Sequence, residues 1–230
     1  MALQAPKTSA SKFTPQDNLE PGSYPARVAR VYGLGTHPQI YQGEAKPSKF
    51  LLTVVYELVD AFMTDEDGNE LEDKPRWVME KFPLNPLDSV KSKSTIRYLA
   101  IDPQAKLEGD WSKVIGMPVS VTIVNNAGKD GRIFDNVGGT TAMRPRDAAK
   151  LPDLVNEGFF FDPSEPNIEY FNKIPKFVQD DIRSAIDFPG SKLEALLNGG
   201  VVPPKRAPEP EPEVDDPDVP DMDDDAPWAD

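Results

Sequence analysis

The chain has 230 residues, no cysteine and a formal net charge of -14. The absence of cysteine excludes disulfides, thiolate metal sites and cysteine nucleophiles. No apolar stretch approaches the roughly 20 residues of a membrane span, and the N-terminus lacks the features of a signal peptide, so we expect a soluble intracellular protein.

The charge is unevenly distributed along the chain. Residues 201–230 hold 11 acidic and two basic residues, whereas residues 1–200 hold 28 acidic and 23 basic residues. The body is therefore only mildly acidic, and the charge of the whole chain does not exclude a polyanionic ligand on one of its faces.

The N-terminal part predicts an arm followed by a first strand. Residues 1–20 are polar and show no periodicity, which indicates a flexible arm. The turn at Pro21-Gly22-Ser23 leads into residues 24–32, whose β-branched and aromatic side chains are typical of a strand. The glycines and proline within residues 33–38 predict that this strand ends there.

The strongest strand pattern covers residues 49–58. Apolar side chains recur there at period two and share one face: Phe50, Leu52, Val54, Tyr56 and Leu58. The opposite face is mixed and is a candidate surface for a ligand: Lys49, Leu51, Thr53, Val55 and Glu57. Turn chemistry at residues 65–70 predicts a long hairpin to a third strand over residues 76–82, which Pro83 ends.

The next segments complete a five-strand pattern. Residues 89–100 lack strand alternation and place apolar side chains on one helical side, which predicts a short helix. A fourth strand over residues 119–124 and a fifth over 132–137 are joined by a glycine-containing turn. Five strands with one helix between the third and fourth is the order of an OB-fold, a small Greek-key barrel. We therefore expect a mainly β protein with such a barrel over residues 21–145.

Residues 146–198 predict a helical extension. Residues 144–155 read as a loop-rich connector, and residues 175–188 as a helix with Pro175 in its first turn. A last short helix begins at the capping-box spacing of Ser191 and Glu194. We expect these helices to pack on the barrel or on a second subunit.

The C-terminal segment, residues 199–230, is acidic and rich in proline, so we expect it to be disordered. From Ala207 onward it contains eleven acids and no base. Its tip places an aromatic residue after a run of acids, which is typical of a protein-docking motif with charge for steering and one ring for anchoring. The docking residues are Asp223, Asp224, Asp225, Pro227 and Trp228. A purely solubilising tail is the alternative.

Single-stranded nucleic acid requires cations for the phosphates and aromatic faces for the bases. The barrel segments supply both types of side chain, and these are the candidate DNA-binding residues: Arg27, Arg30, Tyr32, Tyr41, Lys46, Lys49, Arg76, Trp77, Lys81, Lys91, Lys93, Arg97, Arg132 and Phe134. Tyr32 and Tyr41 bracket the predicted glycine-containing loop, where exposed aromatic rings favour binding over packing. Tyr56 and Phe82 are more typical of the core. A lysine counts as a signal only where several cluster on one face.

Catalytic interpretations have little support in the sequence. The single histidine, His37, precedes a proline in a predicted loop, and two-histidine zinc motifs are excluded. Asp65, Asp67 and Glu70 lack EF-hand spacing and fit a hairpin turn better. We expect no enzymatic activity, no metal and no cofactor.

Two motifs carry a resemblance to single-stranded DNA-binding proteins of the OB-fold type, especially those encoded by tailed bacteriophages. Residues 222–228 (MDDDAPW) are similar to the C-terminal Asp-Asp-Asp-Ile-Pro-Phe of the bacterial family. Residues 22–27 (GSYPAR), followed by 34–36 (LGT), are similar to the first strand and loop of the phage proteins. Here Trp228 is followed by Ala229 and Asp230, so the chain terminus is displaced from the ring.

The resemblance implies a sequence-independent protein that coats single-stranded DNA during phage DNA replication, recombination or repair, in the cytoplasm of an infected bacterium. The acidic tail would then recruit phage replication or recombination proteins such as a polymerase, a helicase-primase or a recombinase. The alternative function is a non-enzymatic replisome interaction module or a DNA-mimicking inhibitor. Oligomers are possible under either interpretation.

Overall fold

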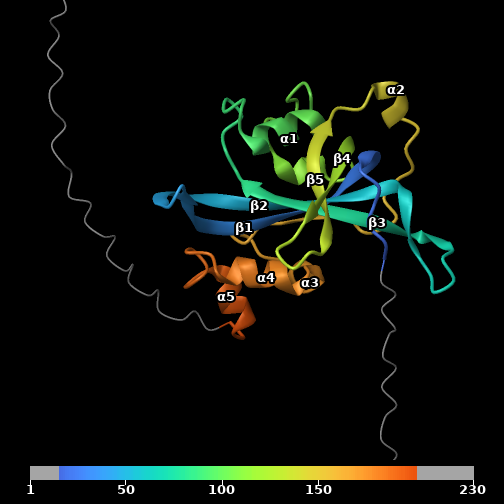
Figure 1. The fold of residues 1–230 in the computed structure, drawn as a ribbon. Coiled ribbons are helices and arrows are strands. Elements are labelled where there is room, and N and C mark those ends of the chain that lie inside the picture. The colour runs from blue at the N-terminus through green and yellow to red at the C-terminus, as the bar shows by residue number, and fades with distance from the viewer. Residues whose placement is uncertain (1–15, 201–230) are drawn as a thin grey trace, which may run out of the picture.

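The computed structural model describes residues 16–200, and within them not the side chain of Tyr41. A strongly curled, open antiparallel sheet forms its centre (Figure 1). The strands are β1 (Gly22–Tyr41), β2 (Glu44–Thr64), β3 (Glu70–Pro83), β4 (Pro118–Ala127), β5 (Ile133–Thr141) and β6 (Phe159–Phe161).

The strand order is β3-β2-β1-β4-β5. One edge of β1 pairs with β2 along nearly its whole length. On the other edge, β4 pairs antiparallel with residues 22–27, and β6 pairs in parallel with residues 30–32. The curl brings β3 toward β5, where Arg76 and Asp135 form an ion pair at 3.1 Å.

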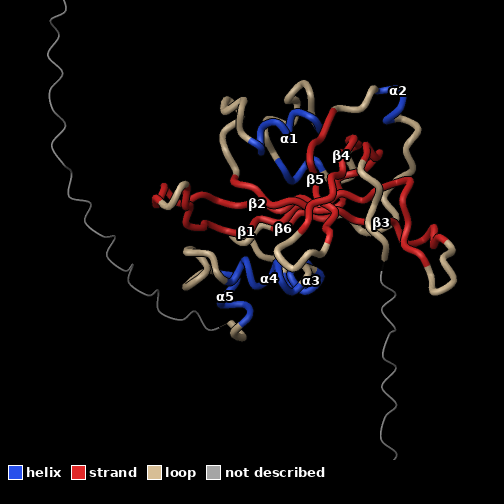
Figure 2. Tube along the Cα trace, in the orientation of Figure 1, coloured by secondary structure: helices blue, strands red, loops and turns tan. Residues whose placement is uncertain are grey.

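Helices lie on both sides of the sheet, as Figures 1 and 2 show. On the concave side lie α1 (Lys93–Ile101) and the short 3-10 helix η1 (Trp111–Val114). On the opposite side of β1 and β2 lie α3 (Ile168–Lys173), α4 (Lys176–Arg183) and α5 (Lys192–Leu197). A single short turn, α2 (Pro145–Ala148), follows β5.

The alternation along β2 divides its side chains between two cores. Leu52, Val54, Tyr56 and Leu58 point into the curl, where Tyr98 of α1 and Trp111 contact each other edge to face. Val55 points outward into a second core, so every residue from 52 to 58 is buried. A strand buried on both faces reads as a nearly continuous apolar run, which is the pattern of this segment.

The second core joins the sheet to the C-terminal helices. Its fully buried side chains come from β1 and β2 and from the chain after residue 158: Tyr32, Leu34, Val55, Phe159, Phe161, Phe171, Ile174, Val178, Ile182 and Leu193. Residues 159–197, which we call the C-terminal extension, therefore pack on the sheet of their own chain.

Several predicted boundaries were wrong. The first strand does not end at residues 33–38 but continues to Tyr41, because register shifts after Val28, Gly33 and His37 absorb the irregularities. The fifth strand continues through Gly138 and Gly139. A helix after the third strand was predicted correctly, but it begins at Lys93 and not at residue 89. The turn at residues 65–70 was also predicted correctly. So was the Ser191 cap of the last helix, whose side chain accepts a hydrogen bond from the Glu194 amide.

Docking of the C-terminal extension is testable by one substitution in the second core. Phe161→Ala is expected to lower the free energy of unfolding by about 3–5 kcal/mol, because it removes a buried ring and leaves a cavity. Phe177→Ala, at a ring that is 61% exposed on α4, is expected to change it by no more than about 0.5 kcal/mol. Urea titration of the two variants measures the difference, and equal effects would contradict the packing.

Candidate nucleic-acid interface

The outer face of β1, β2 and β3 is not available to a ligand. Thr53, Val55 and Glu57, which were expected to face one, are all buried, so this expectation is wrong. The C-terminal extension buries seven apolar side chains against three of this face, and at about 1.5 kcal/mol or more each the ten together contribute about 15 kcal/mol. A stacked base contributes only about 1–3 kcal/mol, so stacking of one or two bases would not offset the loss of this burial.

A stack of rings and cations fixes the extension to the sheet. The Arg30 guanidinium lies 4.5 Å from the centre of the Trp77 ring and 4.7 Å from that of Phe159. Phe159 in turn stacks on Tyr170, with 4.5 Å between the ring centres. Arg30 also donates to the carbonyls of Glu157 and Lys173. Arg30 and Trp77 were predicted to bind DNA, and the structure places both in this internal contact.

Glu57 adds hydrogen bonds to the contacts of that stack. Its buried carboxylate accepts hydrogen bonds from Trp77 Nε1 at 3.0 Å, from the Val155 amide at 2.7 Å and from Asn156 Nδ2 at 2.8 Å. A buried carboxylate is tolerated only when its oxygen atoms are satisfied in this way. Glu57 therefore holds the connector before the extension against β2 and β3.

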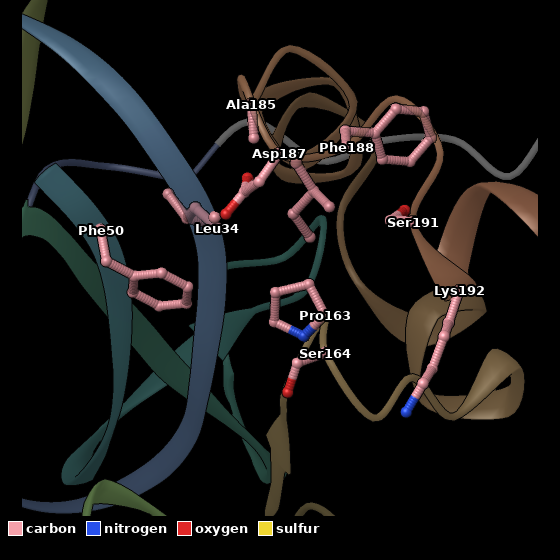
Figure 3. A pocket seen from close by; sticks show the side chains of 11 residues that line it. Leu34, Phe50, Pro163, Ser164, Ala185, Asp187, Phe188, Ser191 and Lys192 are labelled. Atoms are coloured by element: carbon pink, nitrogen blue, oxygen red, sulfur yellow. The ribbon is translucent and has the colours of Figure 1, made fainter. Parts of the chain in front are cut away.

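A small pocket lies along the seam between the sheet and the extension. Figure 3 shows Leu34 and Phe50 on the sheet side, facing Pro163, Ala185 and Phe188 from the extension. Its volume is about 260 Å³.

Next to the pocket, Asp187 accepts hydrogen bonds from the amide and the hydroxyl of Thr36, both at 2.9 Å. A Cβ on Gly35 would lie 2.6 Å from Asp187 Oδ1, and the φ of Gly35 is +86°, so only glycine fits this close approach.

Three further cations from the predicted set are used in internal contacts. Arg27 donates to the carbonyls of Gly116, Leu151 and Pro152, and so ties the connector to β1. Arg76 pairs with Asp135 and donates to the Asp17 carbonyl. Lys81 pairs with Asp181 of α4 at 2.7 Å.

Two more of the predicted cations surround a buried carboxylate inside the curl. Glu80 accepts a hydrogen bond from Arg97 Nε at 2.7 Å and one from the Tyr56 hydroxyl at 2.9 Å, and it pairs with Lys93 at 2.9 Å. Burial, with the Glu80 charge as the second cause, raises the pKa of Tyr56 well above 10.0, so the phenol stays protonated and donates. These residues stabilise the junction of α1 and β3.

Tyr32 is also part of the core. Its ring is fully buried beside Phe159, at 5.8 Å between the ring centres, because the predicted loop after it is strand. The prediction of an exposed aromatic at this position was wrong. The side chain of Tyr41 lies outside the described part of the structure.

Two regions keep predicted residues at the surface. At the β1–β2 hairpin, Lys46 pairs with Glu44, and the exposed Lys49 donates to Asn85 at 2.7 Å. Lys91, in the loop before α1, is exposed. Lys46 and Lys49 at the start of β2 and Lys91 before α1 therefore present cationic groups to solvent.

The β4–β5 hairpin is the second region, and it combines cations with an aromatic ring. Phe134 is 50% exposed, and a Cβ on Gly128 would lie 2.7 Å from its Cε2 atom, so the ring rests against the turn. The Arg132 side chain is 79% exposed and lies 3.3 Å from Asp130. Lys129 at the tip is exposed as well. Sequence reasoning missed Lys129, although its place between two glycines of a hairpin turn was a usable signal.

The docking residues of the acidic tip lie outside the described residues. Within residues 16–200 no helix is long and apolar enough to cross a membrane. Comparison with protein-family models and with curated protein sequences finds no match to this chain.

The internal role of Arg97 gives a prediction. Arg97→Ala is expected to lower the free energy of unfolding by about 3–5 kcal/mol, because it leaves the Glu80 carboxylate buried with a reduced set of partners. Lys91→Ala, at an exposed position in the same region, is expected to change it by no more than about 0.5 kcal/mol. Thermal or urea unfolding checks this, and an Arg97 variant as stable as the Lys91 variant would refute the role of the ion pair.

Proposed function

We propose that this protein binds single-stranded DNA without sequence preference, as a non-enzymatic component of phage DNA replication or recombination. In this proposal residues 21–145 form a barrel of the OB type. The strand order, the position of α1 between β3 and β4, and the approach of β3 to β5 support it. Barrels of this type use the loops at their rim to bind oligonucleotides.

The observation that carries the proposal is the β4–β5 hairpin. It presents the half-exposed ring of Phe134 beside two exposed cationic side chains, Lys129 and Arg132. An aromatic ring next to cations is the combination that single strands require, since the ring stacks on a base of any sequence while the cations meet phosphates. Lys46, Lys49 and Lys91 would add phosphate contacts.

The acidic tail has a separate role in this proposal. Asp223, Asp224 and Asp225 would steer a replication or recombination protein of the phage, and Pro227 and Trp228 would anchor it.

A second candidate function is a protein-interaction module or a DNA mimic. The observation that favours it is that most of the cations expected to meet DNA are paired with carboxylates or backbone carbonyls of the same chain. The two functions differ in whether the protein binds an oligonucleotide at all.

Fluorescence anisotropy with an oligo-dT strand tests the leading function. The five exposed cations named above are expected to give a slope of about -3.5 for the logarithm of the affinity against the logarithm of salt concentration, at roughly -0.7 per phosphate, and each further phosphate contact steepens it by the same amount. Phe134→Ala is expected to weaken binding by about 1–3 kcal/mol, a factor of roughly 5 to 150, through the loss of base stacking.

Two controls accompany this measurement. Tyr170→Ala removes an aromatic side chain that packs inside the extension, and the fraction that stays folded is expected to bind as the unaltered protein does. Deletion of residues 207–230 is expected to raise the affinity at low salt, because the tail is itself a polyanion. No binding at about 50 mM salt would reject the proposal and favour the interaction module.

A further inference from the structure

The sheet has a second outer face, formed by β4, β5 and the first part of β1. The alternation of β4 buries Val119, Val121 and Ile123 and turns the intervening side chains outward. The cross-strand partners of these outward residues lie on the same face. The face comprises Ser23, Pro25, Ser120, Thr122, Val124, Asn126, Phe134, Asn136, Gly138, Gly139 and Thr141.

The composition of this face is unusual for the chain, which contains 39 acidic residues. None of these residues is charged or buried, and Arg27, the next position of β1 on this face, donates to backbone carbonyls of the same chain. A polyanion on this face would meet hydroxyl and amide side chains, and the strand residues of the face add no carboxylate that would repel it.

The surface is also shallow, which permits close contact. Ser23 and Ser120 share a hydrogen bond between their hydroxyls at 2.8 Å. Val124 packs over Gly138, where a Cβ would lie 2.8 Å from Val124 Cγ1. Gly139 lies beside Thr122 without a side chain of its own. The backbone of β5 is therefore accessible next to the hydroxyl of Thr122.

Cationic side chains lie at both ends of the strand pair. Lys129 and Arg132 are in the hairpin that joins β4 to β5, and Arg144, Arg146 and Lys150 follow the end of β5. Arg132 pairs with Asp130, and Arg144 with Asp147 at 2.7 Å. Lys129, Arg146 and Lys150 are exposed and have no ion pair among the described residues. The arrangement is an uncharged track with cations at each end.

We infer that this face is the track along which single-stranded DNA lies, with Phe134 as the stacking platform at one end. The inference rests on the proposed function and assigns its path. Bases contact the hydroxyl and amide groups of β4 and β5, and phosphates reach Lys129 and Arg132 at the hairpin and Arg146 and Lys150 beyond β5. The outer face of β1, β2 and β3 takes no part, because the extension fills it.

Two variants that place opposite charges at position 122 test the inference, with the affinity for an oligo-dT strand as the measurement. Thr122→Glu is expected to lower the affinity about tenfold at low salt, with a smaller loss at high salt, and Thr122→Lys to raise it. A purely structural disturbance would weaken binding in both variants, so the opposite signs separate the two explanations. Asn172→Glu places the same negative charge on the exposed surface of α3 and is expected to bind as the unaltered protein does.

The remaining outcomes are also decisive. Thr122 variants that bind like Asn172→Glu, while the unaltered protein binds DNA, would overturn the track and leave the proposed function intact. Variants that change the oligomeric state in light scattering but not the affinity would show a subunit interface on this face, which also overturns the track. Absence of binding by the unaltered protein would overturn the proposed function itself, and the track with it.

Discussion

The β1–β2 pair is apolar on both of its faces, and this constraint organises the rest of the molecule. One face fills the inside of the curled sheet, where α1 and η1 cover it. The other face carries Tyr32, Leu34 and Val55, which would form one exposed apolar patch if nothing packed on them. The C-terminal extension packs on this face because burial of these side chains is favourable.

Polar contacts determine the position of the C-terminal extension on the sheet. The Arg30 guanidinium between Trp77 and Phe159, and the Glu57 carboxylate with its amide donors, fix the connector and β6 at one place on the sheet. Asp187 fixes the far end through Thr36. Hydrogen bonds and cation–π contacts depend on direction, whereas hydrophobic contacts alone would allow several positions. These polar contacts therefore fix the extension in one position.

This packing has a consequence for function. Arg30, Tyr32, Trp77 and Lys81 on β1 and β3 are already engaged with the extension, whereas Lys46 and Lys49 at the start of β2 stay exposed. Binding chemistry is left at the rim, on the β4–β5 hairpin, and on the uncharged face beside it. Under the proposed function, DNA would therefore bind a different outer face from the one that the strand pattern first indicates.

The sequence predicted the strands and α1 well, because period-two alternation and turn residues act locally. It failed at residues 33–38, where bulges let glycine and proline remain within a strand. It also failed for Arg30 and Tyr32, whose partners Glu157 and Phe159 lie far along the chain. It failed for Trp77 and Arg97 as well, because the strand pattern does not show that these side chains meet the buried carboxylates of Glu57 and Glu80. Phe134 and Arg132 are exposed, because a short hairpin keeps its side chains near the surface. Packing of the C-terminal helices on the sheet was one of two expected alternatives, but the strand β6 was not predicted, because it has only three residues, Phe159–Phe161.

The central claim is that DNA binds on the β4–β5 side while the extension stays in place. Hydrogen–deuterium exchange of the full chain with and without oligo-dT measures both parts together. The account predicts slower exchange in residues 118–141 on addition of DNA and no change in residues 159–197. Faster exchange in residues 159–197, with protection appearing in β2 and β3, would contradict it, since DNA would then displace the extension.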